Sequence, residues 1–138
     1  MGEKLSRGEY LLSSERFEQI LPQICDDQTS MDPEGWSPDN PLWGHCAVVS
    51  LVAQRLYGGN LMRASLDNTP YAESGSHYIN EFDDNDRHDY TAEQFTIGYP
   101  EDLQYEERTR EYLLSNPETS RRYELLEARL NHIVTNQT

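Results

Sequence analysis

The sequence has 138 residues, enough for one domain whose core buries about two thirds of the surface of the unfolded chain. Its 25 acidic residues outnumber 11 basic ones, so the net charge is −14, and Lys4 is the only lysine. A surface of that charge repels nucleic-acid phosphates and anionic lipids, which argues against both as partners. We expect a single acidic domain over residues 1–138, with a small molecule or a peptide as its partner.

The sequence also predicts where the protein is found in the cell. No run of apolar residues approaches the ~18 that a membrane-spanning helix needs. Residues 1–9 lack the apolar core of a secretory signal peptide. Cys25 and Cys46 are the only cysteines, too few for a disulfide framework. We therefore expect a protein of the cytoplasm, which is a reducing compartment.

Apolar residues at helical spacing predict a first helix that begins after Ser13 or Ser14 as its N-cap. These apolar residues are Phe17, Ile20, Leu21 and Ile24. Pro22 lies inside the pattern and should kink or shorten the helix, because it lacks a backbone N–H and its ring crowds the preceding turn. Cys25, at the end of the helix, is interpreted as a packing residue.

A long loop follows over residues 26–44, rich in Pro, Asp and Gly, and it contains Trp36 and Trp43. Long ordered loops are often functional, so the two tryptophans could form the wall of a substrate groove that leads to Cys46. They could equally cap the edge of the core, because Trp is usually partly buried. The sequence leaves both interpretations open.

The rest of the chain is organised around residues 46–57, a stretch that is apolar on most sides and therefore predicts a buried helix. Gly58 and Gly59 then provide the left-handed ending that helices favour. Cys46 lies at the start, where unpaired backbone N–H groups and the positive end of the helix dipole favour a thiolate. Because free cysteines are often simply buried, Cys46 is either a nucleophile or a structural thiol.

The pattern then becomes extended. Residues 60–66 predict one strand and residues 76–82 a second, with His77 and Ile79 on one face of the second strand. An Asp-rich turn over residues 83–86 precedes a third strand that begins over residues 87–90.

Helical signals return after the third strand. Residues 91–94 form a capping-box pattern, which predicts a short helix to about Phe95, and a polar connector follows. Pro117 begins a last helix that should run to about Asn131. Helices packed on a small antiparallel sheet make this an α+β domain.

Three residues have the types and order of a cysteine-dependent catalytic site. A cysteine nucleophile needs a base within hydrogen-bond reach, and the base needs an orienting group on its other nitrogen. Cys46 would be the nucleophile, His77 the base and Asp89 the orienting group. Adjacent strands can place His77 and Asp89 side by side on one face, and we expect that face to pack over the start of the Cys46 helix. Asn40 is a candidate donor to an oxyanion, together with the Cys46 N–H.

Other arrangements of the same residues are possible. His45 or His88 could replace His77 as the base, or Cys46, His45, His77 and His88 could bind a metal. His45 adjoins Cys46 and cannot easily present a ring nitrogen to its sulfur, and His88 should face away if Asp89 faces toward His77. The spacing of these residues is not that of a zinc site. We therefore expect neither a metal nor a cofactor.

Several short motifs between Trp36 and Leu130 together resemble a known family. They are residues 40–49, 58–59, 76–80, 89–95 and 122–126. In type and order they resemble the YunG-like family of small bacterial proteins. The resemblance implies a compact relative of the papain-like and transglutaminase-like cysteine hydrolases, with Cys46, His77 and Asp89 at the catalytic positions. Members often have Gln directly before the cysteine, where this chain has His45, so the resemblance does not imply an oxyanion role for this side chain. His45 is kept as a candidate for the cleft because it adjoins Cys46.

The sequence therefore predicts an acyl-transfer enzyme that hydrolyses an amide, ester or thioester through a thioester on Cys46. The alternative is a catalytically inactive domain of the same fold that binds a small ligand or a protein. Mere binding does not need a helix-start cysteine paired with a histidine and an acid, and this trio is the feature that separates the two hypotheses.

Overall fold

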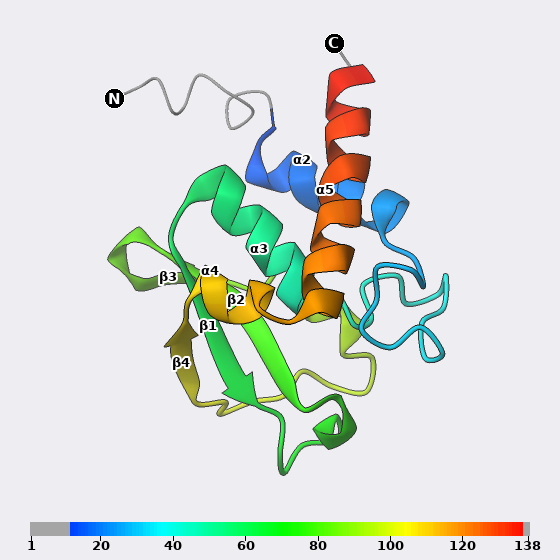
Figure 1. Cartoon of the computed structure of the whole chain (residues 1–138). Helices are drawn as coiled ribbons and strands as arrows, with labels where there is room; N and C mark the ends of the chain where they lie inside the picture. Colours follow the sequence, from blue (N-terminus) through cyan, green and yellow to red (C-terminus); the bar gives the residue numbers. More distant parts are fainter. Residues whose placement is uncertain (1–11, 137–138) are drawn as a thin grey trace.

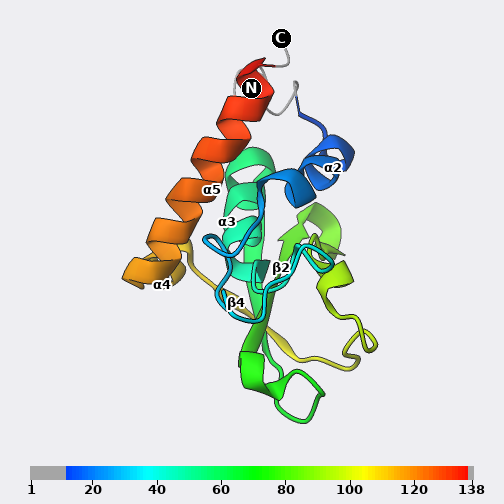
Figure 2. The same cartoon turned by 90° about the vertical axis from the view of Figure 1, so that its right-hand side faces the viewer.

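The computed structural model describes residues 12–136, in which a buried helix lies between a sheet and a second long helix (Figure 1). The buried helix is α3 (Cys46–Tyr57), and it packs against both β2 (Ser76–Phe82) and α5 (Pro117–Asn136). Figure 2 shows α5 and the sheet on either side of α3, and α2 (Ser14–Ile24) packs across the upper part of α5. The described residues therefore form an α+β structure, as the sequence predicts.

Helix α3 begins at Cys46 and ends at Tyr57, which confirms the bounds predicted from the sequence. Most of its side chains are buried in two adjoining parts of the core, because the helix is apolar on nearly all sides. Gly58 follows with a φ of +81°, a backbone conformation that a residue without a Cβ adopts easily. The local sequence alone thus fixes where Cys46 lies on its helix.

The sheet has four antiparallel strands in the order β3-β2-β1-β4. Strand β2 has its predicted bounds, and β1 (Asn60–Ser65) stops one residue before the predicted end. Strand β3 (Asp86–His88) begins and ends earlier than predicted, so Asp89 follows the strand instead of belonging to it. Strand β4 (Tyr105–Arg108) was not predicted, because an edge strand with mostly exposed side chains has no apolar pattern.

The remaining helices differ from the prediction mainly at their ends. Ser13 caps α2 by accepting a hydrogen bond from the Arg16 N–H, and Pro22 does not shorten this helix, because it lies in the last turn. The short α4 (Arg110–Leu114) precedes α5, and α5 runs to Asn136, beyond the predicted Asn131. The other helical segments are single 3₁₀ turns; they are η2 (Ala72–Ser74), η3 (Asp83–Asn85) and η4 (Ala92–Gln94).

Helix α3 packs on a different face of β2 from the one we expected. The Asn80 amide donates to the Ser50 carbonyl of α3 at 3.0 Å, and Tyr78 belongs to the same apolar cluster as Cys46. Side chains alternate between the two faces along a strand, so His77 points to the face opposite to that of Tyr78 and Asn80. Its ring lies against Phe95 there, with 4.7 Å between the ring centroids. Because β3 pairs only with residues 80–82, the edge of β2 beside His77 that faces away from β1 has no strand neighbour among the described residues.

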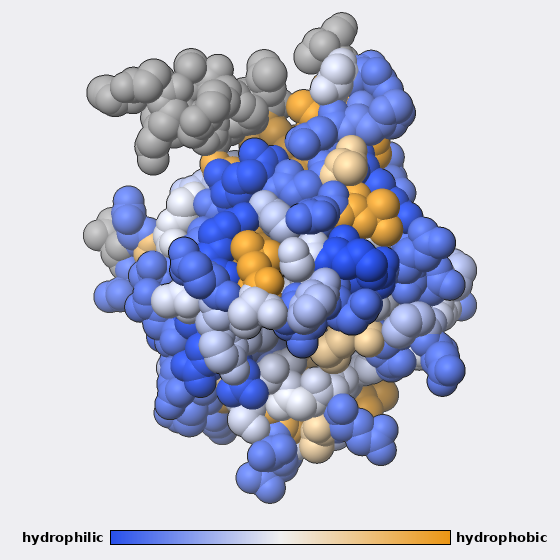
Figure 3. Space-filling model, viewed as in Figure 1, coloured by the Kyte–Doolittle hydropathy of each residue, from blue (hydrophilic) through white to orange (hydrophobic). Residues whose placement is uncertain are grey.

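Hydrophilic side chains cover most of the face seen in Figure 3, and the apolar ones form separate small patches. Among the described residues, no helix is long and apolar enough to cross a membrane. The apolar residues instead gather in the core around α3.

Candidate active site

Cys46 is the first residue of α3, and its exposed fraction is 9%. The preceding residue, His45, makes no side-chain capping hydrogen bond, and within residues 12–136 no other side chain accepts from the N–H groups of the first turn. Gly44 brings the loop to this point with a φ of +78°, and a Cβ there would lie 2.2 Å from the Ser30 hydroxyl oxygen. The loop thus places the thiol of Cys46 at the N-terminal end of α3, which is the positive end of the helix dipole.

His77 and Asp89 form a buried hydrogen-bonded pair. His77 Nε2 lies 2.7 Å from Asp89 Oδ2, and the His77 side chain is only 1% exposed. A carboxylate accepts hydrogen bonds, so Nε2 carries a proton and donates it to Asp89. The other ring nitrogen, Nδ1, is buried and has no hydrogen-bond partner among the described residues. Nδ1 is therefore the nitrogen that is free to exchange a proton with Cys46.

Cys46 and His77 line the same narrow cavity, which has room for about one water molecule. No well-aligned hydrogen bond reaches Nδ1, yet Cys46 is close enough to raise the pKa of His77 through hydrogen bonding and charge. The thiol and the imidazole are therefore neighbours without a well-aligned hydrogen bond between them. Catalytic hydrogen bonds are often long in the absence of substrate.

The surroundings of His77 favour its charged form. Burial alone lowers the pKa of the imidazole, but the hydrogen bond to Asp89, the contact with Cys46 and the charge of the Asp89 carboxylate raise it to about 9. Asp89 shows the matching effect, since the hydrogen bond and charge of His77 outweigh burial and hold the pKa of its carboxyl below the ordinary value. At neutral pH the pair is therefore an imidazolium beside a carboxylate.

Asp89 is itself held by residues that the sequence analysis did not identify. The Tyr99 hydroxyl donates to Asp89 Oδ2 at 2.6 Å, and the Thr91 N–H donates to Oδ1 at 3.1 Å. Phe95 packs edge-on against both His77 and Tyr99. Only the closeness of these residues to Asp89 in the sequence could have pointed to them.

Gln94 connects the loop before Cys46 to the residues around Asp89. Its side-chain amide donates to the Thr91 hydroxyl at 2.8 Å, and its side-chain oxygen accepts from the Gly44 N–H at 3.2 Å. Gln94 also lines the cavity with Cys46 and His77. One buried glutamine thus connects the loop before the cysteine to the residues that hold Asp89. The capping-box pattern predicted a helix at residues 91–95, but the structure has the single 3₁₀ turn η4 there, without a side-chain capping hydrogen bond at Thr91.

Two of the four residues predicted for the cleft, Asn40 and Trp36, do not line the cavity. Asn40 is turned away from the cavity, because its amide donates to the Gln94 carbonyl at 3.0 Å, so the structure does not place it as an oxyanion donor. The indole of Trp36 donates to the Pro41 carbonyl at 2.8 Å and is likewise absent from the cavity.

The other two predicted cleft residues adjoin Cys46. Trp43 does line the cavity, with a partly exposed ring, and its indole N–H donates to Asp32. His45 does not line the cavity, because its ring is fully buried between the Thr29 hydroxyl and the Trp43 carbonyl, at 2.7 Å and 2.9 Å. Of the four, only Trp43 lines the cavity.

The remaining histidines and cysteine are engaged elsewhere. His88 pairs with Glu18 of α2, on the opposite face of the sheet from His77. Cys25 is packed in the main core, where burial raises the pKa of its thiol. No group of three or more His, Cys, Asp and Glu side chains in residues 12–136 has the arrangement of a metal site. The structure thus separates His45 and His88 from the Cys46 and His77 that they could have joined.

Comparison with known families identifies the chain at the level of family. The model of a family described as "YunG protein" matches residues 13–135, nearly the whole chain. The chain belongs to the YunG family. The match extends beyond the stretch from Trp36 to Leu130 that carries the resemblance in the sequence, and it includes α2 and most of α5. No curated protein and no solved structure gives a significant match to this YunG-family chain.

Proposed function

We propose that the protein is a cysteine-dependent acyl-transfer enzyme that hydrolyses an amide, ester or thioester, with a fold of the papain-like type. The observation that carries the proposal is that His77, which lines the same cavity as Cys46, has a buried Nδ1 without a hydrogen-bond partner among the described residues while its Nε2 donates to Asp89. A ring nitrogen that is buried without a hydrogen-bond partner lowers folding stability. Such a group in a native structure therefore calls for an explanation, and a role in catalysis is one. Proton exchange with a neighbouring thiol is such a role.

The reaction divides into two steps with assigned groups. Sγ of Cys46 attacks the acyl carbonyl carbon, and the bond to the leaving group breaks after His77 Nδ1 donates a proton to it. Water then attacks the thioester, His77 removes a proton from that water, and Sγ leaves as a thiolate. Asp89 holds the imidazole in the orientation that points Nδ1 at the sulfur.

The start of α3 provides stabilisation for the oxyanion. The backbone N–H of Cys46 lies in the first turn, which no side chain caps, and the helix dipole adds positive potential there. Since Asn40 is engaged with Gln94, the second donor must come from elsewhere. Backbone N–H groups of the same turn are candidates, because the first turn of a helix leaves several of them without intrahelical partners.

Turnover of model substrates tests the proposal. A panel of chromogenic esters, thioesters and amides should be hydrolysed by the wild type and not by Cys46→Ala, since the variant lacks the nucleophile. Alkylation should occur at Cys46 much faster than at Cys25, which is buried in the core and serves as an internal control. An inert panel together with equal alkylation rates at both thiols would contradict the proposal and favour a binding domain without catalysis.

A further inference from the structure

Helix α5 carries a charged residue within its apolar stripe. Arg122 precedes Leu126 and Leu130 by four and eight residues, and this spacing places all three on one face of the helix. Only 7% of the Arg122 surface is exposed. Arginine is almost never buried to this degree unless it is paired with an anion.

Arg122 has no such partner among the described residues. Its Nη2 donates to the Thr119 hydroxyl at 3.3 Å, and its Nε is buried without any hydrogen-bond partner. Glu118, one turn earlier, accepts from Arg121 instead, at 3.0 Å. Burial, with some repulsion from Arg121, lowers the pKa of the Arg122 guanidinium, as expected for a cation without enough compensating charge. The fold thus maintains an unpaired buried cation, which is unfavourable for stability.

The cation faces a groove with a volume of about 360 Å³, a size in the range of small-ligand sites. Arg63 of β1 also lines this groove and forms no ion pair within residues 12–136. Polar side chains that can donate hydrogen bonds line it as well, among them Ser76, Tyr78 and Thr119. Two arginines without carboxylate partners in a chain of net charge −14 indicate a site for a negatively charged ligand.

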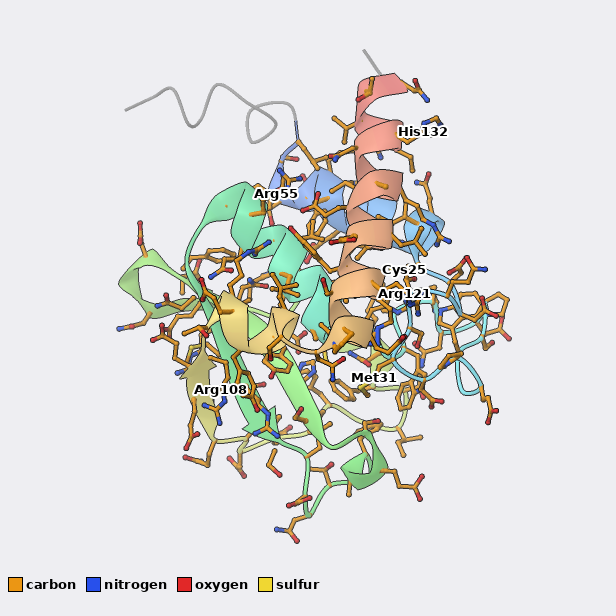
Figure 4. The ribbon with its side chains drawn as sticks, viewed as in Figure 1. Cys25, Met31, Arg55, Arg108, Arg121 and His132 are labelled. Carbon is orange, nitrogen blue, oxygen red and sulfur yellow. The ribbon has the colours of Figure 1, made fainter. Side chains whose placement is uncertain are left out.

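The groove adjoins the cavity of the candidate active site. Met31 and Ser76 line both spaces, and Ala47, the residue after Cys46, lines the groove. Met31 is 48% exposed and lies near the start of α5 in the view of Figure 4, where Arg121 is also labelled. A ligand whose anionic end contacts Arg122 would therefore have its other end beside Cys46.

We propose that this groove, which we call the arginine groove (Met31, Arg63, Ser76, Tyr78, Thr119 and Arg122), binds a carboxylate carried by the acyl substrate. The inference rests on the proposed function, since it assigns the class of substrate to the same site. A guanidinium matches a carboxylate in planar geometry and can bind it with two parallel hydrogen bonds. The net charge of −14 repels a doubly charged phosphate more strongly than a single carboxylate.

Matched alkylating reagents test the groove through the rate at Cys46. Bromoacetyl-glycine and bromoacetyl-β-alanine carry a carboxylate, and their primary amides are neutral reagents of the same shape. The rate of each reagent with Cys46 is divided by the rate of the same reagent with 2-mercaptoethanol, which corrects for its intrinsic reactivity. The normalised rates of the carboxylates should then exceed those of the amides at least about tenfold, the ratio expected for one charge-assisted hydrogen bond. Arg122→Gln should remove this preference. Arg121→Gln is the matched control and should keep it, because Arg121 is exposed and pairs with Glu118.

A binding measurement separates this proposal from the proposed function. Calorimetric titration of Cys46→Ala with acetyl-β-alanine should show binding that Arg122→Gln abolishes and Arg121→Gln preserves. Thermal unfolding identifies any variant that fails to fold, and Arg63→Gln provides a second test in that case, with a weakened preference expected. If Cys46→Ala binds in this way although the wild type hydrolyses no acyl substrate, the groove stands and the hydrolase proposal fails.

Two results would overturn the groove proposal. The first is equal normalised rates for carboxylates and amides in a protein whose Cys46 is otherwise reactive, together with binding that does not depend on Arg122. The second is tighter binding of inorganic phosphate than of acetyl-β-alanine to Cys46→Ala, which would contradict the assignment of a carboxylate.

Discussion

His45 and His77 are both almost completely buried, yet their surroundings shift their pKa values in opposite directions. Burial lowers the pKa of His45 to about 4, because its two ring nitrogens contact only neutral oxygens of Trp43 and Thr29. His77 loses as much solvent, but Asp89 and Cys46 outweigh the effect of burial and raise its pKa to about 9. At neutral pH one buried histidine is therefore neutral and the other is charged.

The comparison shows that the partner, more than burial, decides what a buried histidine does. His45 uses both nitrogens to fix the loop before α3, and no nitrogen is left for chemistry. His77 uses one nitrogen for Asp89 and keeps the other unpartnered beside Cys46. Two residues of the same type, equally buried, thus have a structural role in one case and a candidate catalytic role in the other.

The largest predicted effect is on how folding stability depends on pH. His77 has a folded pKa above the ordinary 6.5, so its contribution is fully present below pH 6.5 and is lost as the pH rises toward 9. His45 has a folded pKa below 6.5, so the unfolded chain binds more protons and stability is lost as the pH falls from 6.5 toward 4. Each histidine should change the free energy of unfolding by about 3 kcal/mol between its folded and unfolded pKa values, at 1.36 kcal/mol per pKa unit.

Denaturant unfolding across this pH range, with one variant for each histidine, would measure the two contributions separately. His77→Gln should remove the loss of stability on the alkaline side, and His45→Gln should remove part of the loss on the acidic side. If the alkaline loss persisted unchanged in His77→Gln, the assignment of a charged His77 at neutral pH would be wrong.

A second prediction concerns reactivity at the site. His77→Gln should slow the alkylation of Cys46 at neutral pH by roughly tenfold or more, because the imidazolium that favours the thiolate is gone. His45→Gln is the control, since His45 directs neither nitrogen at the thiol; it should lower stability and leave the rate per folded molecule nearly unchanged. Mass spectrometry of the alkylated peptides gives both rates. Equal effects of the two variants on Cys46 would show that His77 acts only through the fold.

The smallest predicted effects come from the residues behind His77. Asp89→Asn should lower the pKa of His77 and slow Cys46 alkylation less than His77→Gln does, because the amide keeps the position and loses the charge. Tyr99→Phe removes one hydrogen bond to Asp89, worth about 1 kcal/mol, and leaves the carboxylate a stronger acceptor for His77, so the pKa of His77 should rise, by less than Asp89→Asn lowers it. An NMR titration of the His77 ring resonances measures both shifts. A larger shift in Tyr99→Phe than in Asp89→Asn would contradict this order.

Local patterns in the sequence determined much of the candidate site. The apolar run with two glycines after it placed Cys46 at the start of α3, because helix bounds depend on nearby residues. Strand alternation likewise placed His77 and Asp89 on one face, and they form a hydrogen bond there although β3 ends one residue before Asp89. The spacing of α5 placed Arg122 on the buried stripe with Leu126 and Leu130, a signal that the periodicity already contained.

Only the tertiary structure decided which of these residues meet. His45 and Asn40 are close to Cys46 in the sequence, but the ring of His45 contacts Thr29 and the amide of Asn40 donates to the Gln94 carbonyl, and neither residue lines the cavity. The face of the sheet that α3 covers, and the unpaired state of Arg122, depend on contacts between residues far apart in the chain. The periodicity of apolar residues predicts which side of a helix or strand is buried. It does not predict which residues of the other elements pack against that side.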